Sequence, residues 1–141
     1  MNLAVPTNVL QSIEINHQGL LGVISQIRPI ARNYLQARQF LPSFQAKLLE
    51  HFKIQNSAFF DQLVGRVAAD PKQVKMVEFL SVNLKDLKIK TLIFFDEHSG
   101  NMMDVKPKNF ISDFAGFSDD VLFRINAERE YLIPMLKDIS T

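Results

Sequence analysis

The chain has 141 residues with 16 basic and 15 acidic side chains, a net charge of +1, and no cysteine. This length suits a single domain, expected to span residues 1–141, that buries a sizeable core without a metal ion to hold it folded. The composition excludes disulfides, thiolate catalysis and cysteine zinc sites, and the interspersed charges lack the clustered basic face of a nucleic-acid-binding protein. No apolar run approaches the roughly 18 residues of a membrane span, so we expect a cytoplasmic protein with neither nucleic-acid nor membrane partners.

The first predicted element is a long amphipathic helix near the start of the chain. Pro6 and Thr7 provide a start signal, and the helical spacing of apolar residues continues toward Arg28. Pro29 should end or kink this helix, because proline lacks the amide donor and clashes with the preceding turn. Residues 30–40 are ambiguous: they either continue the helix beyond a kink or form the first connection.

Two further helices follow, each with a proline near its start. Pro42 suits the first turn of a helix that is expected to reach about Val67. Asp70 followed by Pro71 predicts a helix N-cap with proline at the first helical position, and the apolar spacing then continues to about Phe95.

The last helix is predicted to follow a break at residues 99–101 and a loop at residues 102–106. Pro107 can open it, and the helical spacing ends near Lys137. Four long helices with short connections predict an all-α fold, an up-down-up-down antiparallel four-helix bundle.

Polar residues interrupt the apolar stripes that these helices should bury. His17 replaces an apolar residue in the first helix, and His51 and Gln55 lie one turn apart on the inward face of the second. Glu128 lies on the stripe of the last helix, with Arg124 one turn before it. An unpartnered buried polar group costs roughly 2 to 7 kcal/mol, so these side chains are expected to contact one another.

Three segments resemble a known family. Residues 13–17, residues 48–60 and residues 124–134 are similar to the histidine motifs and the last-helix pattern of the hemerythrin-like, or HHE cation-binding, domains. The resemblance implies a four-helix bundle in which histidines and carboxylates from all four helices hold two irons. His17 and His51 would be the first two ligands.

The chain departs from that family pattern at several ligand positions. Gln55 stands where the family supplies a carboxylate, and the inward positions of the third helix are leucines. Arg124, a permanent cation, lies one turn before Glu128 and would oppose a nearby metal. We therefore expect an incomplete diiron site.

Three interpretations of the polar residues follow. In the first, they form a metal-free hydrogen-bonded network with Glu128 paired to Arg124, inside a non-enzymatic binding or regulatory module that needs no cofactor. In the second, His17, His51 and Glu128 hold one iron, zinc or manganese ion for oxygen, nitric oxide or redox sensing. Gln55 then supplies a neighbouring donor, and Arg124 points away toward the bundle end. In the third, the side chains do not meet.

The first interpretation is preferred, and no enzymatic activity is expected, because no further ionisable group is placed as an independent general base. A protein partner or a homodimer would then account for the function. Residues 92–97 and residues 122–128 are also similar to stretches of bacterial helical regulators that bind the primary sigma factor. This second resemblance implies a metal-free regulator with a sigma factor as partner.

Overall fold

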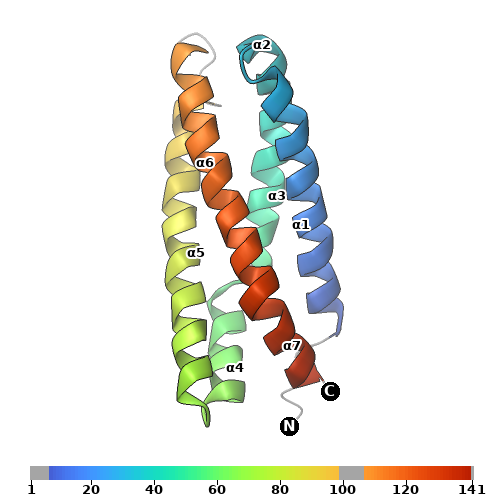
Figure 1. Ribbon diagram of the computed structural model, residues 1–141, viewed down its shortest axis with the longest axis vertical. Helices are drawn as coiled ribbons and strands as arrows, with labels where there is room; N and C mark the ends of the chain where they lie inside the picture. Colours follow the sequence, from blue (N-terminus) through green and yellow to red (C-terminus); the bar gives the residue numbers. More distant parts are fainter. Residues whose placement is uncertain (1–6, 99–106, 141) are drawn as a thin grey trace.

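The computed structural model describes residues 7–98 and 107–140, and within these ranges all regular structure is helical, which confirms the all-α class (Figure 1). No described helix is both long and apolar enough to cross a membrane. The elements in chain order are α1 (Thr7–Ile27), η1 (Arg28–Ile30), α2 (Tyr34–Ala37), η2 (Arg38–Phe40), α3 (Leu41–Ile54), α4 (Ser57–Val67), α5 (Pro71–His98), α6 (Pro107–Ala127), η4 (Glu128–Leu132) and α7 (Ile133–Ser140).

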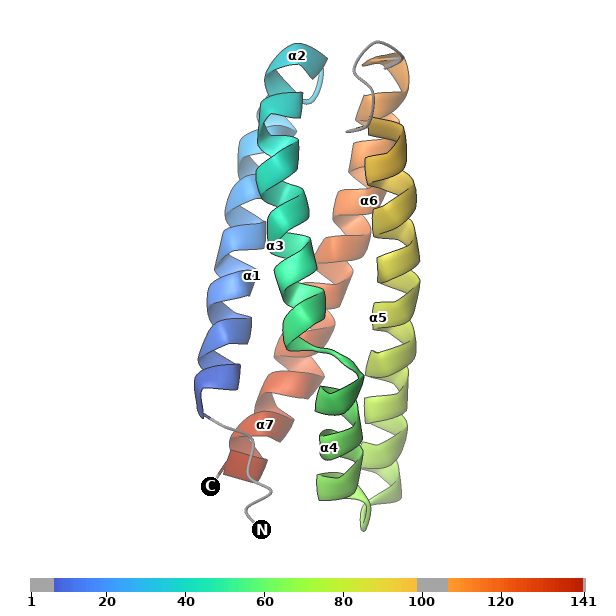
Figure 2. The ribbon, with the colours of Figure 1, turned by 180° about the vertical axis from the view of Figure 1, so that it is seen from behind.

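The long helices pack side by side around one apolar core. Helix α1 lies against α3, α5 lies against α6, and α4 continues below α3 along α5 (Figures 1 and 2). Phenylalanine rings fill one part of this core: Phe94 stacks on Phe117 at 4.6 Å between centroids, and Phe44 meets Phe95 and Phe114 edge to face. This packing fixes the relative positions of helices that are distant in the sequence.

The first helix ends as the sequence predicts. Helix α1 stops at Ile27, and a 3₁₀ turn that contains Pro29 follows. The ambiguous residues 30–40 form a connection of short helical turns. The side chain of Asn33 accepts a hydrogen bond from the amide of Gln36 and starts α2.

The prediction of one continuous helix from Pro42 to Val67 is wrong. The chain leaves the helical conformation at Gln55, whose φ and ψ are −102° and 58°. Asn56 then starts a new helix, α4, because its side chain accepts a hydrogen bond from the amide of Phe59 at 3.0 Å. An asparagine cap of this kind stabilises a helix start, and here it competes with continuation of the preceding helix.

Helix α5 begins at the predicted signal. The carboxylate of Asp70 accepts a hydrogen bond from the amide of Lys72 at 3.0 Å, and the helix starts at Pro71. It continues past Phe95 to His98. The predicted break at 99–101 and the predicted loop at 102–106 lie outside the described residues.

The fourth predicted helix reaches beyond Lys137 but is not regular. A π-helical turn, η4, interrupts it between Glu128 and Leu132, and the amide of Ile133 donates to the carbonyl of Glu128 five residues earlier. Pro134 explains this turn, because it has no amide donor and its ring would clash with the carbonyl four residues before it. Single π-helical turns are frequent at functional sites.

Candidate functional site

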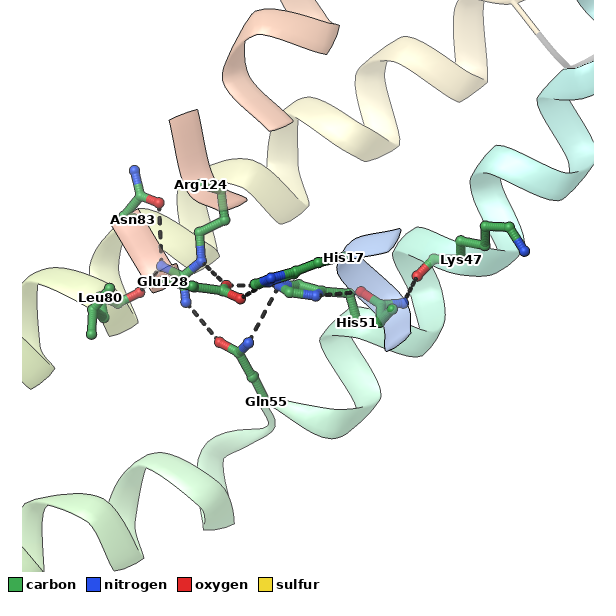
Figure 3. Close-up of polar contacts among 9 residues, drawn as sticks. His17, Lys47, His51, Gln55, Leu80, Asn83, Arg124 and Glu128 are labelled. Carbon is green, nitrogen blue, oxygen red and sulfur yellow. Dashed lines mark hydrogen bonds and ion pairs between the residues drawn. The ribbon is translucent and has the colours of Figure 1, made fainter. Parts of the chain in front are cut away.

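Five buried polar side chains meet inside the molecule (Figure 3). They come from α1 (His17), α3 and its end (His51 and Gln55), α6 (Arg124) and η4 (Glu128), and none is more than 1% exposed. The structure therefore excludes the interpretation in which they do not meet. We call these five residues the polar cluster.

The carboxylate of Glu128 is the centre of the polar cluster. Its Oε1 lies 2.6 Å from Nε2 of His17, and its Oε2 lies 2.8 Å from Nε2 of His51. Nε of Arg124 donates to the same Oε2. Burial by itself raises the pKa of this carboxyl, but the charge on His51, the hydrogen bonds from both histidines and the guanidinium outweigh it and hold the pKa far below its usual range. Glu128 is thus an ionised acceptor.

Arg124 uses its whole guanidinium within the interior. Besides Glu128, it donates through Nη1 to the carbonyl of Leu80 at 2.5 Å and to Oδ1 of Asn83 at 3.2 Å, and through Nη2 to Oε1 of Gln55 at 2.7 Å. Burial lowers the pKa of this guanidinium, while Glu128 opposes the shift. The expectation that Arg124 points away from Glu128, which accompanied the single-ion interpretation, is wrong because these partners hold it in the polar cluster.

Asn16 fixes the orientation of His51, and the sequence interpretation missed it. Its Nδ2 donates to the carbonyl of Lys47 at 2.9 Å, which turns its Oδ1 toward Nδ1 of His51 at 2.6 Å. Both ring nitrogens of His51 therefore face oxygen atoms, Oδ1 of Asn16 on one side and the carboxylate of Glu128 on the other. The signal was present, because Asn16 is spaced three residues after Ile13 on the buried stripe.

The break between α3 and α4 positions Gln55. With the backbone out of the helix, its side chain reaches Arg124 through Oε1 and approaches Nε2 of His51 to 3.4 Å through Nε2. The amide oxygen accepts from the guanidinium where a carboxylate would add a second negative charge. This role differs from that of a metal-bridging ligand.

His17 keeps one polar atom without a partner. Its Nε2 is used by Glu128, whereas its buried Nδ1 makes no hydrogen bond among the described residues. Because Nε2 faces an ionised carboxylate, it carries a hydrogen, and in the neutral form of the ring Nδ1 is then a free acceptor.

The geometry of the donor set does not match that of a metal site. Ligand atoms of His17, His51 and Glu128 all lie within 4.8 Å of one another. A tetrahedral ion bound at 2.0 to 2.2 Å needs its ligand atoms roughly 3.3 to 3.6 Å apart, but the histidine nitrogens and the carboxylate oxygens here are in direct hydrogen-bond contact at 2.6 and 2.8 Å. The residue types suit one ion, whereas their spacing and the guanidinium on Glu128 do not. A diiron centre does not fit, since Gln55 and Arg124 occupy the space beside the only carboxylate of the cluster.

A second cluster of titratable side chains lies at the C-terminal end of α5. His98, which the sequence places at the end of its helix, contacts Oδ2 of Asp113 with Nε2 at 2.8 Å, and Glu97 lies 3.9 Å away. The hydroxyl of Tyr34 donates to the carbonyl of His98 at 2.7 Å. These contacts join α2, α5 and α6, and no spacing pattern in the sequence indicates them.

Comparison with protein-family models, with curated proteins and with solved structures finds no match to this chain. The resemblance to hemerythrin-like domains therefore stays a prediction from the three segments described above.

Proposed function

We propose that this protein is a non-enzymatic binding module with the up-down-up-down arrangement of a hemerythrin-like four-helix bundle, in which the polar cluster is a metal-free structural core. One observation carries the proposal. The guanidinium of Arg124 donates a hydrogen bond to the carboxylate of Glu128, and a metal ion would need that same carboxylate as a ligand.

Charge supports the metal-free interpretation. Glu128 is the only acid of the polar cluster, and it already faces the cation of Arg124. Two unit charges 4 Å apart repel by about 4 kcal/mol at an effective dielectric of 20. A divalent ion would meet about twice that repulsion from the guanidinium of Arg124.

Helix packing supports the bundle arrangement. Helix α1 lies against α3, α5 lies against α6, and the connections over 28–40 and 68–70 are short.

Exposed apolar side chains on α5 support a binding role. Val82, Ile89 and Leu92 are 66%, 58% and 70% exposed and lie on the helix away from the core. A protein partner, either a second copy of the chain or a sigma factor, would cover these residues.

A second candidate function is a sensor with a single iron or zinc ion. It is favoured by the convergence of His17, His51 and Glu128 from three elements, and by Asn16, which holds Nδ1 of His51 as residues around metal-bound histidines do. In that case His17, His51 and Glu128 would hold the ion, which would supply oxygen, nitric oxide or redox chemistry.

Titration with Zn²⁺ in competition with an indicator of micromolar affinity separates the two candidates. The metal-free core predicts that the wild type competes no better than the double variant His17→Ala/His51→Ala. Uptake of one Zn²⁺ per chain by the wild type, lost in the double variant, would support the sensor and reject the proposal. Circular dichroism of both proteins shows whether the double variant is folded.

A further inference from the structure

A surface cleft lies directly outside the polar cluster, between α1 and the last helix. Its volume is about 240 Å³. The residues that line it are Glu14, His17 and Gln18 of α1, Arg129 of η4, and Ile133 and Lys137 of α7. The cleft thus combines two cations and one carboxylate with a histidine that belongs to the buried cluster.

His17 links the cleft to the interior. Its Nε2 contacts the carboxylate of Glu128, and the same side chain lines the cleft. This Nδ1 has no hydrogen-bond partner among the described residues, although the side chain is only 1% exposed. An unsatisfied buried acceptor destabilises the protein, and a ligand with a hydrogen-bond donor would remove that cost.

The cleft selects a particular ligand chemistry. Arg129 and Lys137 attract an oxyanion. Nδ1 of His17 and the carboxylate of Glu14, in contrast, accept hydrogen bonds and would repel an oxyanion that has no hydrogen to donate. A small anion that carries its own hydroxyl satisfies both requirements, and hydrogen phosphate is the simplest example.

We propose that this cleft is a binding site for a small hydroxylated oxyanion, with anionic oxygens on Arg129 and Lys137 and a hydroxyl that donates to Nδ1 of His17. The inference deepens the proposed binding role and rests on the metal-free cluster, because a metal on Nε2 of His17 would leave the hydrogen on Nδ1 and make it a donor.

The test uses inorganic phosphate as the probe and sulfate as its matched control. Sulfate has the same shape and charge as hydrogen phosphate but carries no hydrogen at neutral pH. Isothermal titration at constant ionic strength is expected to show phosphate binding at least about tenfold tighter than sulfate, because a site built for a donor leaves its acceptors unpaired with the wrong anion.

Variants locate the site. Arg129→Gln and Lys137→Gln are each expected to weaken phosphate binding about fivefold or more, as the loss of one partly exposed charge contact allows. Arg32→Gln, which removes an exposed cation in the turn before α2, is expected to leave phosphate binding unchanged, because α2 and α7 lie at opposite ends of the molecule (Figure 1). Each of these side chains is exposed, so folding should be preserved.

Three results would overturn the inference: no phosphate binding, equal binding of sulfate, or equal weakening by Arg32→Gln. None of them would alter the metal content of the protein, so they leave the proposed metal-free core standing. Stoichiometric metal in the purified protein would instead reject that core, and with it the acceptor assigned to His17.

Discussion

Replacement of Arg124 by methionine tests the role of the guanidinium in the polar cluster. The side chain is 1% exposed and contacts Glu128, Leu80, Asn83 and Gln55. Methionine fills much of its volume but leaves the ionised carboxylate of Glu128 without the permanent cation that pairs with it. Removal of one partner of a buried ion pair costs about 3–5 kcal/mol, so the free energy of unfolding should fall by that amount.

Urea denaturation followed by circular dichroism measures the change. Arg129→Met is the matched control, since Arg129 is exposed, and its effect should stay within about 0.5 kcal/mol. In a Glu128→Gln background the same Arg124→Met substitution should cost clearly less, because the carboxylate charge is gone. A loss below about 1 kcal/mol in the wild type, or the same loss in both backgrounds, would refute the reasoning.

Three further predictions follow from the structure. Folding lowers the pKa of Glu128, so the ionised carboxylate stabilises the fold fully at a pH above its unfolded pKa of about 4.3, and this stabilisation is lost as the pH falls below that value. In an acid titration, Glu128→Gln should therefore show a shallower loss of stability than the wild type. Asn56→Ala should lower the free energy of unfolding by about 0.5–2 kcal/mol in urea melts, through loss of the α4 cap; an unchanged midpoint would contradict that role. Gly22→Ala should raise it by about 0.5–1 kcal/mol, because an added Cβ meets open space within α1, whereas Gly19→Ala should gain less, since its Cβ would lie 3.2 Å from the Lys47 side chain.

Helix positions could be predicted where a local signal decides them. The cap at Asp70 and the proline at 71 mark the start of α5, and Pro29 marks the end of α1, because each acts through the backbone of its own turn. The membership of the polar cluster could also be predicted, since helical periodicity places His17 and Glu128 on buried faces.

The break at Gln55 and the π-helical turn after Ala127 could not be predicted from periodicity. Either change rotates the following side chains relative to a regular helix, and only packing against other helices decides whether it occurs. Asn56 and Pro134 were the local signals, but each is also tolerated near helix ends. Likewise, the contact between Asn16 and His51 forms only when α1 and α3 lie side by side, so the sequence pattern alone does not indicate it.

The central claim is that the polar cluster is complete without a metal. Elemental analysis of the protein, purified from cells grown in rich medium and then dialysed, tests it most directly, because a site of useful affinity stays occupied through such handling. The metal-free core predicts less than about 0.2 iron, zinc or manganese per chain. A content near one ion per chain that disappears in His17→Ala/His51→Ala would contradict it.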